Sequence, residues 1–166
     1  GACDTFDGKI ARAMKNRTKE MEIFGIQIDS LCDMVCFGVT PVIISYQMGL
    51  NSVWGIAIEI LFVLCGVIRL AYFNVLEELK HTNPETDQAK GYRGLPITTI
   101  TIIYPIVYLF HPLVSHETFL LFLAIMHIVV AFLYVLDFKL KKPGNSVIAA
   151  MMVLVTAVMV CILFVE

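Results

Sequence analysis

The chain has 166 residues, of which 58% are hydrophobic and 16% are charged, and its formal net charge is −2. Soluble domains carry about 25% charged residues, and the mean hydropathy of this chain is +0.82, so the composition excludes an ordinary water-soluble domain. The charges are gathered in a few segments, and we expect no nucleic-acid partner. The composition is that of an integral membrane protein.

Five apolar stretches are long enough to cross a bilayer as helices, since about 20 apolar residues suffice. In chain order they cover residues 25–48, 53–77, 95–113, 117–137 and 145–165. Residues 1–14 look like the end of a further helix, and residue 1 is not Met, so we expect upstream helical sequence. Pro41 and Pro105 fall inside spans, where each predicts a kink that needs local compensation. The predicted fold is all-α, a polytopic transmembrane helix bundle forming one integral-membrane domain over residues 1–166.

Basic residues indicate how the spans are oriented, because cytoplasmic loops of membrane proteins are enriched in Lys and Arg. Eleven of the twelve Lys and Arg residues lie in segments that alternate along the chain and share one side: Lys9, Arg12, Lys15, Arg17, Lys19, Lys80, Lys90, Arg93, Lys139, Lys141 and Lys142. The exception, Arg69, falls within a span. We therefore predict that the basic side faces the cytoplasm.

Four aspartates lie near this basic side. Asp4 and Asp7 are three residues apart, and Asp29 and Asp33 are four apart; on helices, each pair would share one face. If the two helix ends pack together, the four carboxylates converge, and such a group must be protonated or bridged by cations. Oxygen ligands without a nearby His or Cys favour a hard cation: Mg²⁺, Mn²⁺ or Ca²⁺.

The residues around these aspartates suit a phosphate-bearing ligand. Gly8 and Gly25 have no side chain and would let a ligand approach the backbone. Arg12 offers a planar fork of N–H donors that matches phosphate oxygens. The alternative is that the aspartates are solvated helix ends or caps beside a basic loop, which we would favour for one aspartate but not for four.

The blocks "DTFDGKIAR" and "GIQIDSLCD" resemble the signature of the CDP-alcohol phosphotransferase family, D-x-x-D-G-x-x-A-R…G-x-x-x-D-x-x-x-D. They cover residues 4–12 and 25–33, and every fixed position is present: Asp4, Asp7, Gly8, Ala11, Arg12, Gly25, Asp29 and Asp33. The spacer between the blocks is longer than usual in the family by about four residues, roughly one helical turn. The family core has six helices, with the first block at the cytoplasmic end of the second. The resemblance therefore implies that N-terminal helices are missing from this chain.

The resemblance also implies a role for each motif residue. Three aspartates are expected to hold a pair of divalent cations on the CDP diphosphate: Asp4, Asp7 and Asp29. Asp33 is the expected general base, which would take the proton of the attacking alcohol, and it is also expected to contact the second metal. The nucleotide and its diphosphate are expected to contact five residues: Gly8, Ala11, Arg12, Thr18 and Gly25.

Further segments, "FGIQIDSLCDMVCFGVTP", "IRLAYFN" and "GLPIT", resemble the membrane-embedded phosphatidylserine synthases of this family. That resemblance implies transfer from CDP-diacylglycerol, or an archaeal CDP-lipid, to L-serine, with release of CMP. Arg69 and Arg93 are candidates to bind the acceptor, against snorkelling for Arg69 and the positive-inside rule for Arg93. Asn74 is either a helix-end cap or a pocket residue. We also expect a homodimer in a prokaryotic cell membrane, with the active site at the cytoplasmic face.

Three other functions remain open. Glycerol 3-phosphate or inositol phosphate could replace serine, although a phosphate-bearing acceptor would be expected to need a more basic pocket. A cation channel or transporter is a second alternative, but the later spans contain no ladder of acids, and Glu59 is a lone acid nearer the opposite side. A structural membrane subunit without activity is the third. His127 is expected to hydrogen-bond between helices rather than to bind a ligand.

Overall fold

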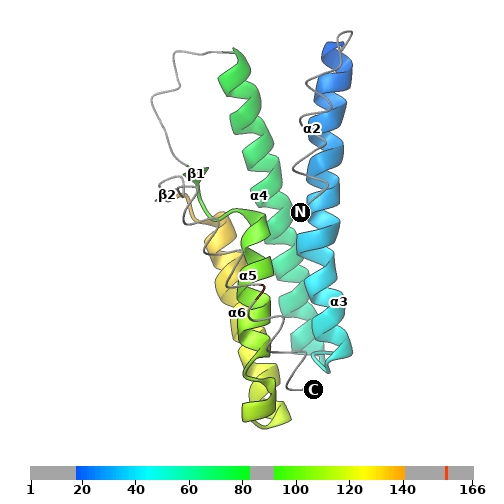
Figure 1. Cartoon of the computed structure of the whole chain (residues 1–166), viewed down its shortest axis with the longest axis vertical. Helices are drawn as coiled ribbons and strands as arrows, with labels where there is room; N and C mark the ends of the chain where they lie inside the picture. Colours follow the sequence, from blue (N-terminus) through cyan, green and yellow to red (C-terminus); the bar gives the residue numbers. More distant parts are fainter. Residues whose placement is uncertain (1–17, 83–91, 141–155, 157–166) are drawn as a thin grey trace. The chain divides into compact units, whose positions relative to one another are not determined.

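The computed structural model describes residues 18–82, 92–140 and 156 (Figure 1). The chain divides into two compact units, residues 1–32 and 33–166. Nearly all regular structure in the described part is helical, and its only strands are the two-residue β1 (Tyr92–Arg93) and β2 (Lys139–Leu140). The prediction of an all-α fold is confirmed.

The described part of the first unit belongs to α2 (Lys19–Asp33), which ends at the first residue of the second unit. Thr18 precedes the helix, and its hydroxyl oxygen accepts a hydrogen bond from the Met21 N–H at 3.3 Å. This bond satisfies one of the N–H groups that the first helical turn leaves without a partner. Thr18 is therefore the N-cap of α2.

The second unit continues with a π-helical turn, η1 (Met34–Val39), that passes into α3 (Thr40–Gln47). Pro41 has no N–H to donate, and its ring would crowd the carbonyl four residues back. The preceding residue, Thr40, donates its N–H to the Val35 carbonyl, five residues back, and its hydroxyl bonds the same oxygen at 2.9 Å. The wider turn is thus the local compensation that Pro41 was predicted to need.

The long helices α4 (Val53–Thr82) and α6 (His116–Val135) pack against each other (Figure 1). Each begins at a serine N-cap. The Ser52 hydroxyl accepts the Gly55 N–H at 3.1 Å, and the Ser115 hydroxyl accepts the Thr118 N–H at 3.4 Å. Between α3 and α4 the chain turns at Gly49, whose φ of 113° suits glycine.

The predicted span 95–113 forms short pieces rather than one long helix. The pieces are η3 (Ile97–Thr99), α5 (Ile100–Tyr108) and η4 (His111–Leu113). Pro96 precedes the first piece, Pro105 lies inside α5, and Pro112 lies in the last. Each proline removes a backbone donor and restricts the preceding residue, which accounts for the interruptions.

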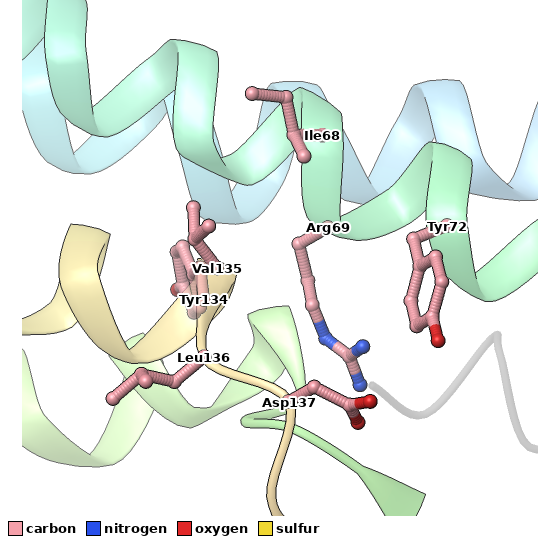
Figure 2. A pocket seen from close by; sticks show the side chains of 7 residues that line it. All are labelled: Ile68, Arg69, Tyr72, Tyr134, Val135, Leu136 and Asp137. Atoms are coloured by element: carbon pink, nitrogen blue, oxygen red, sulfur yellow. The ribbon is translucent and has the colours of Figure 1, made fainter.

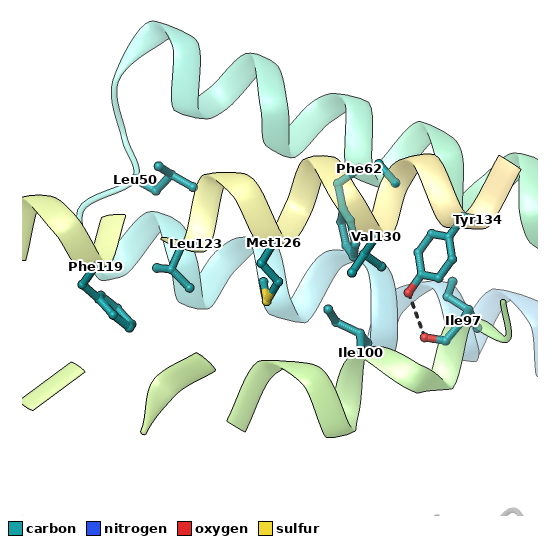
Figure 3. Close-up of a cluster of buried hydrophobic side chains, with 10 residues drawn as sticks. Leu50, Phe62, Ile97, Ile100, Phe119, Leu123, Met126, Val130 and Tyr134 are labelled. Carbon is teal, nitrogen blue, oxygen red and sulfur yellow. Dashed lines mark hydrogen bonds between the residues drawn. The ribbon is translucent and has the colours of Figure 1, made fainter. Parts of the chain in front are cut away.

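Apolar side chains from these helices meet in one buried cluster (Figure 3). Phe62 of α4 and Phe119 and Leu123 of α6 are fully buried within it. At one end the Tyr134 hydroxyl donates to the Ile97 carbonyl at 3.0 Å, as the dashed line in Figure 3 shows. This bond fixes the C-terminal end of α6 against η3.

Three helical stretches are long and apolar enough to cross a membrane: Lys19–Gln47, Val53–Leu76 and His116–Val135. Ile97–Leu113 forms a shorter apolar helical segment. These correspond to four of the five predicted spans, and they are what an integral membrane protein requires. The fifth, 145–165, lies outside the described residues apart from residue 156, and so does the expected helix end at 1–14.

Candidate active site at the basic end of the helices

The second motif block lies on α2. Gly25, Asp29 and Asp33 recur every four residues in this helix, so the helical register places them along one face. Asp29 is exposed, whereas Gly25 and Asp33 are half-buried. Carboxylates four residues apart on a helix are donors suited to a hard divalent cation. The two aspartates therefore fit the metal that the motif implies.

The first motif block lies outside the described residues, with the five predicted site residues Asp4, Asp7, Gly8, Ala11 and Arg12. Among the residues that are described, no three His, Cys, Asp or Glu side chains gather into a metal site. The convergence of four carboxylates therefore stays a prediction. A nucleotide contact by Thr18 also stays a prediction, and the structural role of this residue is to cap α2.

Asp33 is related to α4 through its neighbour, Met34. A Cβ added at Gly66 would lie 3.3 Å from the terminal methyl carbon of Met34, so the methionine packs where Gly66 has no side chain. Gly66 is buried and precedes Arg69 by three residues, which is less than one helical turn. The small residue at 66 thus lets the side chain next to Asp33 pack on the part of α4 that carries Arg69.

Arg69 is buried, with 5% of its surface exposed. Its Nε donates to the Leu95 carbonyl at 2.8 Å, and its Nη2 donates to the Gly94 carbonyl at 3.4 Å. The guanidinium has five N–H donors in a rigid fork, and these bonds hold the group in place with two of them. Snorkelling along lipid, the structural alternative for Arg69, is wrong because the side chain turns inward onto protein backbone.

The segment that Arg69 binds is shaped by Gly94. Its φ is 72°, in the region that favours glycine, and its N–H donates to the Phe138 carbonyl at 2.7 Å. A Cβ at this position would lie 2.9 Å from the Leu136 carbonyl oxygen and 3.3 Å from Nη1 of Arg69. The chain before η3 and the chain after α6 therefore meet around the guanidinium, and there β1 and β2 form an antiparallel pair.

A pocket of about 240 Å³ opens beside the guanidinium (Figure 2). Its polar lining consists of Arg69 and Tyr72 from α4, Tyr134 from α6, and Asp137 just after α6. Figure 2 shows the Asp137 carboxylate facing the Arg69 guanidinium. Apolar side chains complete the wall. The pocket thus presents a carboxylate and a guanidinium side by side at the C-terminal end of α6.

The other two acceptor candidates lie on α4 and on β1. Asn74 is half-buried on α4, five residues beyond Arg69 and therefore about 140° further round the helix. It is not a helix-end cap, because α4 continues to Thr82. Arg93 lies in β1, where it pairs with Lys139. Acceptor binding by Asn74 or Arg93 stays a prediction.

Sequence reasoning missed Asp137, although the sequence carried a signal for it. This acid follows the apolar span 117–137 directly and lies two residues before Lys139, on the predicted basic side. A search for acids at the basic ends of the later spans would have found it. Tyr72 was within reach for a similar reason, since it follows Arg69 by three residues and so lies on the same side of the helix.

A second group of polar side chains lies deeper in the helices. Glu59 on α4 and His127 on α6 are 3% and 0% exposed. The Nδ1 of His127 lies 2.8 Å from the Leu123 carbonyl of its own helix, so the predicted bond between helices is replaced by one within α6. Nearby, the hydroxyls of Ser45 and Tyr104 are 2.9 Å apart. Oε1 of Glu59 and Nε2 of His127 have no hydrogen-bond partner among the described residues.

Comparison with known proteins identifies the family. The family model for CDP-alcohol phosphatidyltransferase matches residues 1–135. The CDP-diacylglycerol–serine O-phosphatidyltransferase of Saccharomyces cerevisiae is 38% identical over 110 residues, which are 65% of this chain and 38% of that protein. The protein of the same name from Methanocaldococcus jannaschii is 31% identical over 144 residues, covering 87% of this chain and 61% of that protein.

A third relative is the archaetidylserine synthase of Methanothermobacter thermautotrophicus, which is 36% identical over 107 residues, 64% of this chain and 41% of that protein. The matched part of the chain thus spans between 38% and 61% of the length of these three relatives. The family match covers most of the chain and includes both motif blocks. The chain belongs to the CDP-alcohol phosphatidyltransferase family.

Proposed function

We propose that the protein transfers the phosphatidyl group of CDP-diacylglycerol to the hydroxyl of L-serine, forming phosphatidylserine and releasing CMP. The observation that carries this proposal is the complete family signature in blocks 4–12 and 25–33, within a chain that matches the family over residues 1–135. The names of the yeast and archaeal relatives support serine as the acceptor. The archaetidylserine synthase relative makes an archaeal CDP-lipid the alternative donor.

Four carboxylates are proposed to hold two divalent cations, Mg²⁺, Mn²⁺ or Ca²⁺: Asp4, Asp7, Asp29 and Asp33. When bound, such cations would offset the charge of the diphosphate and stabilise the departing phosphate of CMP. Asp29 and Asp33 support the assignment because the register of α2 places them on one helical face. Oxygen donors of this kind suit hard cations.

Asp33 is proposed to take the proton from the serine hydroxyl as its oxygen attacks. A new bond forms between that oxygen and the phosphorus that carries the lipid, while the bond from this phosphorus to the oxygen shared with CMP breaks. The electron pair of the broken bond leaves with CMP, and the proton passes from Asp33 to water. A carboxylate positioned in this way typically contributes about 10²–10⁴-fold to the rate.

The nucleotide is proposed to lie against residues with little or no side chain and one arginine: Gly8, Ala11, Arg12, Thr18 and Gly25. Gly25 is half-buried on α2, one turn before Asp29, which supports a close approach of the ligand to the helix there. For the acceptor we propose Arg69, with Arg93 and Asn74 as further candidates. The buried guanidinium beside the pocket supports Arg69.

We propose further that residues 1–166 form one catalytic domain and that its active site faces the cytoplasm. The placement of eleven of twelve basic residues on one side supports this orientation. A prokaryotic cell membrane is supported by the archaeal relatives, whereas the yeast relative comes from a eukaryote. The proposal of a homodimer rests on the family resemblance.

The test uses the full-length protein in detergent or proteoliposomes, with CDP-diacylglycerol, Mn²⁺ or Mg²⁺ and labelled L-serine. The expected result is labelled phosphatidylserine and CMP in equal amounts. CMP release with glycerol 3-phosphate or inositol phosphate, and none with serine, would show that serine is not the acceptor. Cation flux into liposomes without CMP release would instead indicate a channel or transporter. The absence of both CMP release and cation flux would indicate a structural subunit.

A further inference from the structure

We propose that the pocket beside Arg69 recognises the charged groups of an α-amino-acid acceptor, with Arg69 binding the carboxylate and Asp137 binding the ammonium group. The inference rests on the proposed function, because it presumes that the acceptor hydroxyl belongs to such a molecule. It adds to that function by assigning Asp137 as the residue that determines acceptor specificity. Asp137 lines the pocket and faces the guanidinium (Figure 2).

The guanidinium is held in place before any ligand arrives. Bonds from Nε and Nη2 to the carbonyls of Leu95 and Gly94 fix its plane, and the side chain is 5% exposed. A group fixed in this way loses little entropy on binding, and its remaining donors match a carboxylate. Arg69 can therefore serve at once as a clamp on the 94–95 segment and as an anion-binding group.

Asp137 supplies the opposite charge in the same pocket. It lies within electrostatic range of the Arg69 guanidinium, and its carboxylate offers several acceptor sites to an ammonium group. An α-amino acid, whose ammonium and carboxylate groups are attached to the same carbon, complements such a pair. An acceptor that carries a phosphate would instead meet repulsion from Asp137, which is how a binding site discriminates against a wrong ligand.

Size and position agree with this assignment. The pocket volume of about 240 Å³ is below the roughly 300–1,000 Å³ that drug-sized ligands occupy, so it suits a small acceptor. The tip of the Met34 side chain, next to Asp33 in the chain, packs at Gly66, within one turn of Arg69 on α4. The inference requires a serine held by its charged groups to present its hydroxyl to Asp33.

The experiment compares acceptors that differ by one charged group. L-serine carries both groups, 3-hydroxypropanoate lacks the ammonium group, and ethanolamine lacks the carboxylate. CMP release and lipid formation are measured with CDP-diacylglycerol and Mn²⁺ for the full-length wild type, Asp137→Asn and Glu117→Gln. Glu117 is an exposed acid in the first turn of α6, at the opposite end of a helix about 30 Å long, and it controls for the loss of a charge.

In Asp137→Asn, the KM for serine should rise about ten- to a hundredfold, the range for a lost hydrogen bond to a charged group. The KM for 3-hydroxypropanoate should fall, because this anion no longer meets the repulsion of Asp137, and glycerol 3-phosphate should become a better acceptor for the same reason. Glu117→Gln should behave like the wild type. An unchanged ratio of serine to 3-hydroxypropanoate in Asp137→Asn overturns the inference, because a merely structural role for Asp137 would leave selectivity as it was.

Arg69→Lys keeps the positive charge but loses the fork of N–H donors. The KM values for serine and ethanolamine should therefore differ less in this variant than in the wild type. Its melting temperature is measured alongside, because Arg69 also holds the 94–95 segment. Equal discrimination against ethanolamine by a folded Arg69→Lys protein would contradict the carboxylate assignment. If the wild type transfers only to another acceptor, the proposed function fails; if it uses serine and Asp137→Asn is unaltered, only the present inference fails.

Discussion

Two regions of the second unit place ionisable side chains within apolar helices, and they differ in how those side chains are accommodated. Near the C-terminal end of α6, the Arg69 side chain from α4 donates to two backbone carbonyls and faces Asp137 in a pocket. Ten residues earlier on α4, about 15 Å along the helix, Glu59 is 3% exposed, and its Oε1 has no hydrogen-bond partner in the described part of the chain.

The second region is closely packed. The His127 ring meets Phe62 edge-on with ring centroids 4.8 Å apart, and it meets Tyr104 at 6.4 Å. Glu59 lies within electrostatic range of Tyr104. Polar groups here are embedded among aromatic rings, whereas those around Arg69 border a space that a ligand can enter. An ionisable residue in a span is a functional candidate by default, but a binding site also needs a cavity that can hold the ligand.

The difference separates two expectations. Substitutions at the basic end should change chemistry or acceptor selectivity, whereas substitutions in the cluster of Ser45, Glu59, Tyr104 and His127, here called the buried polar cluster, should change stability at most. Each of the following experiments tests that division.

The largest effect is expected at Asp33. Asp33→Asn keeps the shape of the side chain but cannot take the proton of the acceptor hydroxyl, so lipid formation should fall by at least about a hundredfold. The measurement is labelled phosphatidylserine formed per minute, with the melting temperature of the variant as a check on folding. A folded Asp33→Asn protein with activity near that of the wild type would remove Asp33 as the base.

Removal of divalent cations should have an effect of similar size, and it should be reversible. EDTA should abolish CMP release, and excess Mg²⁺ or Mn²⁺ should restore it, because carboxylates bind such cations through oxygen. Asp29→Asn should raise the cation concentration needed for half-maximal activity. Full activity in the presence of the chelator would rule out the proposed metal site at α2.

Much of the fold could be predicted from the sequence because helices in a bilayer satisfy their own backbone hydrogen bonds. The apolar runs therefore predicted α4 and α6 closely. The form of the compensation at Pro41 was beyond prediction, since a π-helical turn and a sharp kink both relieve the same steric conflict. The interruption of span 95–113 was foreshadowed by Pro105, but its division into three pieces depended on local geometry.

The candidate site was predictable only in part. Arg69 stood out because a charge inside a span is costly, whereas its two carbonyl partners come from residues 94 and 95, more than twenty positions away. Gly94 in turn bonds Phe138, a contact that no local pattern encodes. The position of Asp137 beside Arg69 follows from this long-range meeting of segments.

Gly94 tests whether the pocket depends on that meeting of segments. Gly94→Ala should lower the free energy of unfolding by about 1–3 kcal/mol, because the residue has a positive φ and the added Cβ approaches the Leu136 carbonyl. The KM for serine should also rise. Thr98→Ala, at an exposed position on the same segment, is the control and should change stability by less than about 0.5 kcal/mol. Equal melting temperatures for the two variants would contradict the proposed constraint.

The smallest effect is expected in the buried polar cluster. Glu59→Gln replaces the acid by an amide of the same shape, about 15 Å along α4 from Arg69, so kcat and KM for serine should stay within about twofold of the wild type. The comparison is Asp137→Asn, the same chemical change at the other region, measured in the same assay. If a Glu59→Gln protein of unchanged melting temperature lost activity tenfold, the cluster would take part in catalysis or in ligand binding. The buried polar cluster and the pocket beside Arg69 would then belong to one functional site. The presence of a pocket would no longer separate a functional region from a structural one.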